Sequence, residues 1–347
     1  MTPLLRLAIA AVAALTTAGI SGVAIRAAGP VDRPRDRGSH LAPTTTSGGL
    51  GVIAALAVGL LVLGQDFSGA DAHATPSLTA FVLAAALGAM GALDDLFDLP
   101  ARPKLLIQGL AALLFTAFGA RVETISSPFG AASLGPLFGA LGSALWIVVV
   151  VNAVNFMDGV NGLAAGACLL MLTAAAVACH VAGREAAALL AVLAAAGLMG
   201  FCPWNFPKAR LFQGDAGSLF TGFILAAVLL IAPGPGAGGR VPLHFGPTLL
   251  TPFLTDVLLT LVRRARRRAR LLDAHAEHLY QRWFAAHGRR HAAVTLRVLA
   301  IIGLYSVLAL GLLATRDAGA QWTVFGAGVA VAVGAWLWLS ARLDHRR

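Results

Sequence analysis

Two adjacent carboxylates, Asp94 and Asp95, stand at the end of an apolar segment. Neighbouring carboxylates repel each other unless a cation lies between them. The pair therefore predicts a site for a cation, with Asp94 and Asp95 as candidate catalytic groups. The alternative is a solvated helix end, which the nearby Pro100 and Pro103 would favour.

A second group of polar side chains lies inside an apolar segment. Asn152, Asn155 and Asp158 are spaced three residues apart, so on a helix they form one drifting polar stripe. Amides in such a stripe suit recognition of a base or a sugar, and Gly159 and Gly162 permit close backbone approach. A simple helix C-cap would need one glycine and no stripe of amides, so the pattern favours substrate binding.

A third acidic residue, Asp215, follows Gly214 and precedes an apolar span. A carboxylate just before a helix is a good N-cap, and that is the structural alternative. The amides at a helix N-terminus also bind anions, and Gly214 leaves room for a phosphate. An acidic residue beside a phosphate is a natural ligand for magnesium, so Asp215 is the predicted metal ligand.

The longest basic segment begins with six arginines in the eight residues from Arg263 to Arg270. Anchoring to anionic lipids explains that run. His275 and His278 follow, three residues apart, and are expected to share a helix face near Tyr280 and Arg282. They indicate a pyrophosphate or substrate contact, or a metal pair, and zinc is disfavoured because no third spaced ligand completes a site.

One more carboxylate, Asp256, lies inside an apolar span about seven residues before Arg263. That spacing corresponds to roughly 10 Å of helix. An ionisable residue at such depth in a membrane segment is a functional candidate.

The composition shows what must position these residues. Of 347 residues, 58% are hydrophobic and 12% are charged, and the mean hydropathy is +0.79. Soluble domains carry about 25% charged residues, so the composition excludes an ordinary soluble globule as well as a disordered or fibrous chain. The three cysteines form no disulfide or zinc pattern.

The apolar residues fall into about eleven stretches, each near the length that a helix needs to cross a bilayer. The stretches are 4–25, 48–64, 76–93, 105–120, 137–154, 163–181, 186–201, 218–232, 245–262, 293–314 and 322–339. We therefore predict an all-α, polytopic integral membrane protein with about 11 transmembrane helices in a single domain, residues 1–347.

The basic residues predict the orientation. Of the 26 Lys and Arg residues, 21 fall in one alternate set of connections and the C-terminal tail. Because this bias marks the cytoplasmic side, the N-terminus is expected outside and the C-terminus in the cytoplasm. The predicted cytoplasmic loops lie near 26–47, 94–104, 155–162, 203–217 and 263–292, and they hold most of the acidic residues.

The net charge of +10 does not indicate nucleic-acid binding, because the basic residues lie between apolar blocks. A multi-span transporter or lipid flippase with a cytoplasmic cation and anion site is the competing class. Transporters place ionisable groups near the midplane on broken helices, whereas here only Asp256 lies within a span. A purely structural membrane protein has no need for aspartates at several loops of one face.

Taken together, the motifs resemble those of the polyprenyl-phosphate N-acetylhexosamine-1-phosphate transferases, glycosyltransferase family 4. The matching order spans residues 32 to 282, and two parts of it resemble the O-antigen-initiating branch, the segment around His40 and the segment from His278 to Arg282. The remaining matches are Asp94-Asp95 with Lys104 and Gln108, Asn152-x-x-Asn155-x-x-Asp158-Gly159, Gly214-Asp215-x-Gly217-Ser218, Asp256, and His275-x-x-His278.

The resemblance implies a magnesium-dependent transfer at the cytoplasmic face of the bacterial inner membrane, with manganese as an alternative ion. A UDP-N-acetylhexosamine would donate a sugar phosphate to undecaprenyl phosphate, releasing UMP and initiating a lipid-linked cell-envelope glycan such as the O-antigen of lipopolysaccharide. Membrane lipids are the other expected partners, and a homodimer stays open.

It also implies roles for individual residues. Asp94, Asp95, Asp158, His275 and His278 would be catalytic, and Asp215 and Asn155 would bind the metal. The expected substrate-binding residues are Asn152, Asn155, Lys104, Gly214, Arg282, Asp256 and His40.

The chain departs from the family pattern at several positions. Asn161 stands where a second aspartate is usual, Thr46 lies where the family has a basic segment, Gln213 replaces an apolar residue and Ala276 replaces an arginine. These departures concern the choice of sugar and the rate more than the class of reaction.

Overall fold

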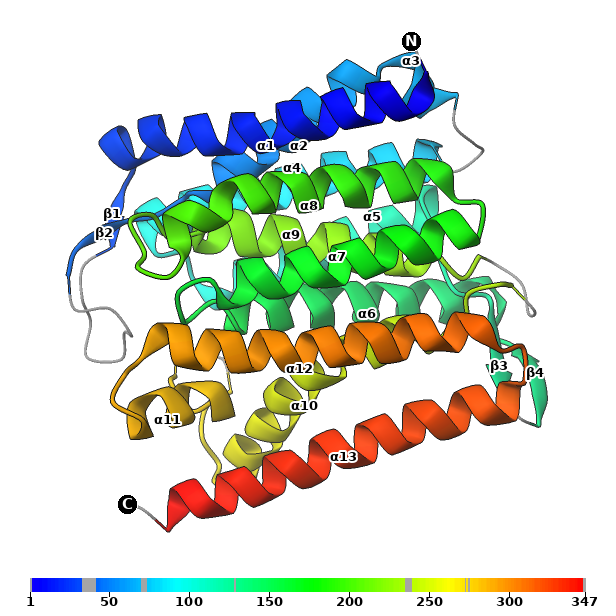
Figure 1. The fold of residues 1–347 in the computed structure, drawn as a ribbon. Helices are drawn as coiled ribbons and strands as arrows, with labels where there is room; N and C mark the ends of the chain where they lie inside the picture. Colours follow the sequence, from blue (N-terminus) through cyan, green and yellow to red (C-terminus); the bar gives the residue numbers. More distant parts are fainter. Residues whose placement is uncertain are drawn as a thin grey trace.

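The computed structural model describes residues 2–32, 42–69, 74–127, 129–234, 239–271, 273 and 275–345. Its long helices form a single bundle (Figure 1). The predicted substrate residue His40 lies outside the described residues. The helices are α1 (Pro3–Ala28), α2 (Gly49–Leu63), α3 (Gln65–Ser68), α4 (Ala74–Phe97), α5 (Ala101–Phe118), α6 (Gly135–Phe156), α7 (Leu163–Val181), α8 (Glu185–Asn205), α9 (Gly214–Ile231), α10 (Phe245–Arg266), α11 (Leu279–Ala286), α12 (His291–Gly311) and α13 (Ala318–Asp344).

The prediction of an all-α polytopic membrane protein is confirmed. In the part of the chain that the structure describes, ten helices are long and apolar enough to cross a membrane. The shorter apolar helix α2 corresponds to the one predicted span that remains, 48–64. Each predicted stretch coincides with one helix, because twenty apolar residues in lipid satisfy their backbone polar groups only by forming a helix or a closed barrel.

The two chain ends lie at opposite ends of the bundle, as an odd number of crossings requires (Figure 1). The short strands β1 (Val31–Asp32) and β2 (Thr44–Thr45), helix α11 and the C-terminus lie at one end, which we call the site end. The opposite end carries the N-terminus and an antiparallel hairpin of β3 (Thr124–Ser127) and β4 (Gly130–Ser133), in which Thr124 pairs with Ser133. The sequence did not predict this hairpin. That the site end faces the cytoplasm stays a prediction from the distribution of basic residues.

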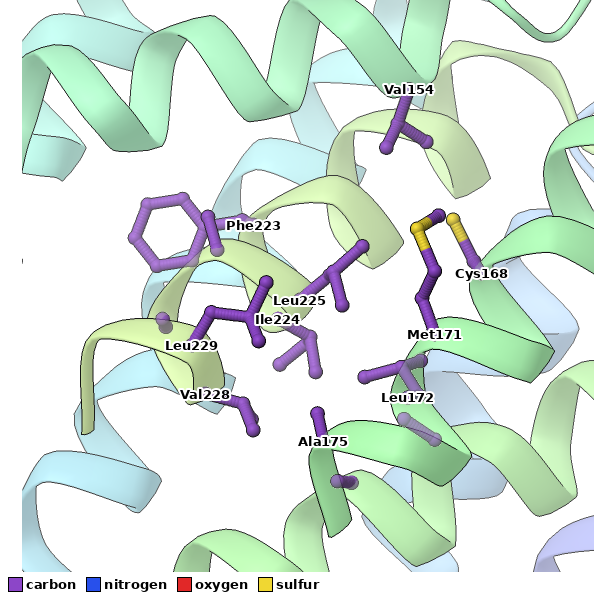
Figure 2. Close-up of a cluster of buried hydrophobic side chains, with 14 of the residues drawn as sticks. Val154, Cys168, Met171, Leu172, Ala175, Phe223, Ile224, Leu225, Val228 and Leu229 are labelled. Atoms are coloured by element: carbon purple, nitrogen blue, oxygen red, sulfur yellow. The ribbon is translucent and has the colours of Figure 1, made fainter. Parts of the chain in front are cut away.

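Helix α9 forms the centre of the bundle. Its residues from Ala216 to Ile231 are all buried, and it packs against α4, α6, α7 and α2. Figure 2 shows part of this core, where Phe223, Leu225 and Val228 of α9 lie among residues of α6 and α7. A helix that is apolar on every side is expected to be buried on every side. The burial of α9 fixes the position of its N-terminus, where Asp215 lies.

Two glycines let neighbouring helices approach the start of α9. A Cβ atom at Gly91 of α4 would overlap the backbone of Asp215, and a Cβ at Gly49 of α2 would overlap the backbone of Gly217. Because backbone atoms cannot turn aside as a flexible side chain does, these positions require glycine. The close contacts bring the last turn of α4 against the first turn of α9.

We expect Gly91→Ala to separate α4 from α9 and to lower both stability and activity. Overpacking of this kind costs about 1–3 kcal/mol. Gly109 of α5 is the matched control, since a Cβ there would meet nothing within 4 Å. Thermal unfolding of both variants in detergent checks this. An unchanged midpoint for Gly91→Ala would show that the helices do not need this close contact.

Candidate functional site

The adjacent aspartates lie in the last turn of α4, not in a long loop. Helix α4 continues to Phe97 and α5 begins at Ala101, so the connection predicted over 94–104 is much shorter. The reason is local: the backbone N–H of Leu99 donates to Asp94 Oδ1 at 2.6 Å and closes the turn. The two carboxylates are thus held on a helix end.

Lys104 of α5 joins two of the carboxylates. Its Nζ donates to Asp94 Oδ2 at 2.5 Å and lies 3.8 Å from Asp215 Oδ2. The Asp94 side chain is only 8% exposed, so this ion pair is largely shielded from water. Lys104 therefore lies inside the predicted site and can attract an anionic group to it.

Asp95 positions the start of α9. Its Oδ1 accepts the backbone N–H of Asp215 at 2.9 Å, and its Oδ2 accepts the hydroxyl of Ser47 at 2.8 Å. Asp95 therefore satisfies an N–H of the first turn of α9. The alternative that Asp215 itself caps the helix is wrong, because α9 begins at Gly214 and Asp215 lies within its first turn.

Gly214 has φ +70°, a conformation that favours glycine. A Cβ at this position would lie 2.6 Å from Thr46 Oγ1 and 2.9 Å from the backbone nitrogen of Ser47. The segment before α2 therefore packs directly over the start of α9. Its backbone carbonyls and amides bond there too, since Gly48 N donates to Phe212 O at 2.9 Å.

Asn155, at the end of α6, contacts Asp215 directly. Its Nδ2 donates to Asp215 Oδ1 and to the hydroxyl oxygen of Ser218, both at 2.9 Å. The amide nitrogen is thus used within the protein, and a metal contact from Asn155 would fall to its amide oxygen. This geometry brings two of the predicted metal ligands together.

Asn152 has a different environment. Its Nδ2 donates to Gln108 Oε1 of α5 at 2.6 Å and to Val148 O at 2.8 Å. These contacts join α5 to α6 one turn away from Asn155. The hydrogen bond between the helices satisfies the amide N–H of Asn152 in an apolar environment, and substrate binding by Asn152 stays a prediction.

Asp158 lies in the turn after α6 and faces the same group of charges. Burial raises the pKa of Asp158 well above its ordinary value, and the negative charges of Asp215 and Asp95 raise it further. Four carboxyl groups therefore gather here, and Lys104 forms an ion pair with one of them, Asp94. We call the five residues Asp94, Asp95, Lys104, Asp158 and Asp215 the carboxylate cluster.

The composition of the carboxylate cluster fits a hard divalent cation. Its excess of negative charge and its oxygen donors are those that magnesium prefers. Within the described residues, no group of three or more His, Cys, Asp or Glu side chains is arranged to hold a metal ion by itself. Magnesium usually takes one or two carboxylates, with waters and substrate phosphates as its other ligands, so an incomplete cage is compatible with it.

The two histidines precede α11 and do not share a helix face, so that prediction is wrong. Helix α11 begins at Leu279, and His278 is its extended N-cap residue. The rings nevertheless lie close, with centroids 4.9 Å apart, and His278 lies 5.5 Å from Phe156. A loop that folds back over the end of α6, and not a helix, brings the two histidine rings together.

Tyr280 fixes this loop over α6. Its hydroxyl donates to Phe156 O at 2.8 Å, and a Cβ at Gly159 would collide with that hydroxyl. The loop therefore packs on the turn that carries Asp158, two residues beyond Phe156. The histidines therefore lie over the end of α6, with both rings near Phe156.

Asp256 is buried and accepts several hydrogen bonds. Its Oδ1 accepts Leu279 N at 2.7 Å and Trp336 Nε1 at 3.1 Å, and its Oδ2 accepts Tyr280 N at 3.3 Å. His278 Nδ1 lies 3.9 Å from Asp256 Oδ1. These contacts hold the start of α11, and a direct substrate contact by Asp256 stays a prediction.

Arg282 of α11 points to the C-terminal helix. Its guanidinium donates to Ser340 Oγ at 2.7 Å and to Asp344 Oδ1 at 2.7 Å, and its side chain is 3% exposed. Substrate binding by Arg282 stays a prediction. Its charge is directed to α13 because Asp344 is the acidic partner on that helix.

Some site residues were not predicted from the sequence. Ser47 holds Asp95, and Trp336 holds Asp256 from eighty residues away. Ser47 has φ +64°, which is uncommon for a residue with a side chain. A serine in a loop or a tryptophan in a membrane helix has many ordinary explanations, so no sequence signal marked these two.

We expect the histidine loop to make the protein sensitive to acid. Burial lowers the pKa of His275 to about 4, and the positive charges of His278 and Arg264 contribute. In the unfolded chain the pKa is about 6.5, so between those values the unfolded state binds more protons and stability rises with pH. Acidification from pH 6.5 to 4 therefore lowers stability, and His275→Gln removes part of that dependence.

Thermal unfolding in detergent across this pH range measures the effect. The exposed His345, substituted by Gln, is the control and should leave the pH dependence unchanged. Identical pH profiles for the wild type and His275→Gln would show that His275 does not titrate differently in the folded state.

Comparison with known proteins identifies relatives of the whole bundle. The family model described as "Glycosyl transferase family 4" matches residues 77–232. Over 332 residues the chain is 30% identical to the decaprenyl-phosphate N-acetylglucosaminephosphotransferase of Mycolicibacterium smegmatis, covering 88% of this chain and 80% of the relative.

Two further relatives extend the comparison. A probable undecaprenyl-phosphate N-acetylglucosaminyl 1-phosphate transferase of Bacillus subtilis is 28% identical over 81% of this chain and 77% of its own. The phospho-N-acetylmuramoyl-pentapeptide-transferase of Deinococcus radiodurans is 30% identical over 80% of this chain and 88% of its own. Identity at this level, spread over most of both chains, establishes that this multi-pass membrane protein belongs to glycosyl transferase family 4, as a phosphosugar transferase of the polyprenyl-phosphate type.

Proposed function

We propose that the protein transfers an N-acetylhexosamine 1-phosphate from a UDP-sugar to undecaprenyl or decaprenyl phosphate. The observation that carries the proposal is the carboxylate cluster, in which carboxyl groups from α4, α9 and the turn after α6 gather with Lys104 of α5 at one end of a membrane bundle. N-acetylglucosamine is the first candidate sugar, because relatives from two genera carry it in their names.

The reaction exchanges one phosphate bond for another. An oxygen of the polyprenyl phosphate attacks the β-phosphorus of the UDP-sugar, the bond from that phosphorus to its bridging oxygen breaks, and UMP leaves with the bond's electron pair. The products are UMP and a polyprenyl diphosphate sugar. Such a transfer needs positioning and neutralisation of charge more than a covalent nucleophile on the protein.

The residues divide this work. Lys104, paired with Asp94, attracts the acceptor phosphate to the end of α4. Asp94 is our candidate for accepting a proton from that phosphate. Asp95 holds the start of α9, so that Asp215 keeps its orientation toward Asn155.

Asp215, Asp158 and the amide oxygen of Asn155 would hold a magnesium ion at this point. The ion would neutralise charge on the diphosphate when it is bound. The excess of carboxylates over Lys104 supports this assignment. His275 and His278 would contact the donor phosphates, since their loop packs on the turn of Asp158.

The acceptor explains the membrane scaffold. A polyprenyl phosphate keeps its chain in the bilayer, and the cluster lies at the ends of lipid-facing helices such as α5. The bias of basic residues supports a cytoplasmic position for this end, where UDP-sugars are available. The product would then initiate a lipid-linked glycan of the bacterial cell envelope, with the O-antigen as one example.

The test uses purified protein in detergent with undecaprenyl phosphate and a panel of UDP-sugars. UMP release is expected with a UDP-N-acetylhexosamine such as UDP-GlcNAc, and not with UDP-glucose. Release must require the lipid phosphate. Release of UDP in place of UMP would indicate transfer of the sugar alone, and either that result or no release with any donor would reject the proposal.

A further inference from the structure

The C-terminal helix α13 is mostly exposed to lipid, yet its last turns form a buried polar contact. Few residues of α13 are buried, and three of these lie near its C-terminal end. The buried residues are Gln321, Gly328, Trp336, Ser340 and Leu343. In lipid, apolar side chains gain little by leaving the tails, so hydrogen bonds and close packing hold helices together. The polar C-terminal end of α13 is therefore one of the parts that bind the bundle specifically.

Four residues make this contact, and we call them the C-terminal latch: Arg263, Arg282, Ser340 and Asp344. Arg282 donates to Ser340 Oγ at 2.7 Å, to Ser340 O at 3.1 Å and to Asp344 Oδ1 at 2.7 Å. Arg263 of α10 donates to Ser340 Oγ at 3.2 Å and to Asp344 Oδ1 at 3.0 Å. The C-terminal end of α13 is thus bonded to α10 through Arg263 and to α11 through Arg282.

The same helix reaches the histidine loop by a second route. Trp336, one turn before Ser340, donates its indole N–H to Asp256 Oδ1 at 3.1 Å. Asp256 in turn accepts the N–H of Leu279, the residue after His278. Both routes meet at α11: the latch holds Arg282 on its second turn, and Asp256 holds its first residue.

We propose that Ser340 and Asp344 are positioning residues for the donor side of the site. They hold α11 through Arg282, and α11 keeps His278 against the end of α6, 5.5 Å from the ring of Phe156. The inference rests on the proposed function, in which the histidines contact the donor phosphates. It adds that the C-terminal helix controls use of the UDP-sugar without touching it.

The alternative is that α13 only stabilises the bundle. A second contact of α13 separates these possibilities, because Tyr305 of α12 donates its hydroxyl to Gly328 O at 2.6 Å, far along α13 from the latch. Tyr305→Phe removes one anchoring hydrogen bond of α13 and leaves α11 untouched. It is the matched control for the latch.

The experiment compares the double variant Ser340→Ala/Asp344→Ala with Tyr305→Phe, each as the full chain in detergent. We expect the double variant to lose roughly 10- to 100-fold in kcat/KM for the UDP-sugar, the range that a small misplacement of a binding group can cost. The KM for polyprenyl phosphate should stay unchanged. The conservative pair Ser340→Thr/Asp344→Asn keeps the acceptors and should restore most of the loss.

A readout without turnover completes the test. Diethyl pyrocarbonate modification, located by mass spectrometry, reports whether His278 is buried; in the wild type it is 1% exposed. The double variant should be modified there faster, and Tyr305→Phe should not. Equal losses for both substrates that follow the thermal midpoint, with His278 still protected, would overturn the proposal. If the wild type releases no UMP, the proposed function fails, while the protection of His278 still decides whether the latch holds its loop.

Discussion

Asp215→Asn is expected to lower kcat by roughly 100-fold or more, the scale seen when one charge-stabilising group is lost from an active site. Asn keeps the size of the side chain and one oxygen, but it removes the charge that faces Lys104 and Asn155. Because the charge acts mainly as the phosphate bonds rearrange, binding of the polyprenyl phosphate should change little. Steady-state kinetics for both substrates measure this.

Asp317→Asn is the matched control for that substitution. Asp317 caps the start of α13 by accepting the N–H of Gly319, at the end of α13 away from the latch. Since Asn is also a good N-cap, the control should keep its turnover and its stability. An Asp215→Asn protein with wild-type kcat would reduce Asp215 to a structural residue at the start of α9.

Removal of divalent cations should abolish turnover. The cluster brings the carboxyl groups of Asp94, Asp95, Asp158 and Asp215 together with Lys104, so four acidic groups face one ammonium group before any diphosphate enters, and their repulsion helps to raise the pKa of Asp158. A diphosphate adds further negative charge to this group. Excess EDTA is therefore expected to stop UMP release completely, and added magnesium or manganese should restore it.

Potassium chloride at the same ionic strength is the control, and it should not restore UMP release. A thermal scan in EDTA adds a second observation. Because packing of α9 holds the fold, the unfolding midpoint should stay unchanged without the ion. Turnover that continues undiminished in excess EDTA would remove the metal from the account.

The spans were predictable because length and hydropathy decide them in a bilayer. The stretch 218–232 predicted the helix that becomes α9, although not that it would be the most deeply buried helix. Hydropathy reports that a segment is apolar, and it does not report whether lipid or protein covers it. The hairpin of β3 and β4 was missed, because the two strands are only four residues long and consist mostly of small or polar residues, which give no clear strand pattern.

The acidic residues of the site were also predictable, but their partners were not. Asp94, Asp95 and Asp215 stand out because carboxylates are rare in membrane segments. Ser47 and Trp336 do not stand out, and only the fold brings them to Asp95 and Asp256. Spacing alone did not reveal that Asn152 turns toward Gln108 of α5, because a stripe of amides drifts around a helix.

The histidine loop shows a further limit of spacing. A separation of three residues predicted a shared helix face for His275 and His278, but the helix begins only at Leu279. Asp256 receives the N–H groups of Leu279 and Tyr280, and this contact starts the helix there. A long-range hydrogen bond decided the boundary, and local sequence could not reveal it.

The most direct measurement follows the β-phosphorus of the donor. Purified protein is incubated with undecaprenyl phosphate and UDP-GlcNAc that carries a radioactive β-phosphate, and the lipid and aqueous phases are separated. The account predicts that the label enters the lipid phase in equal amount to the UMP released, and that Asp215→Asn and EDTA both prevent this. Label that stays in the aqueous phase as UDP, while sugar enters the lipid, would show transfer of the sugar alone and would contradict the account.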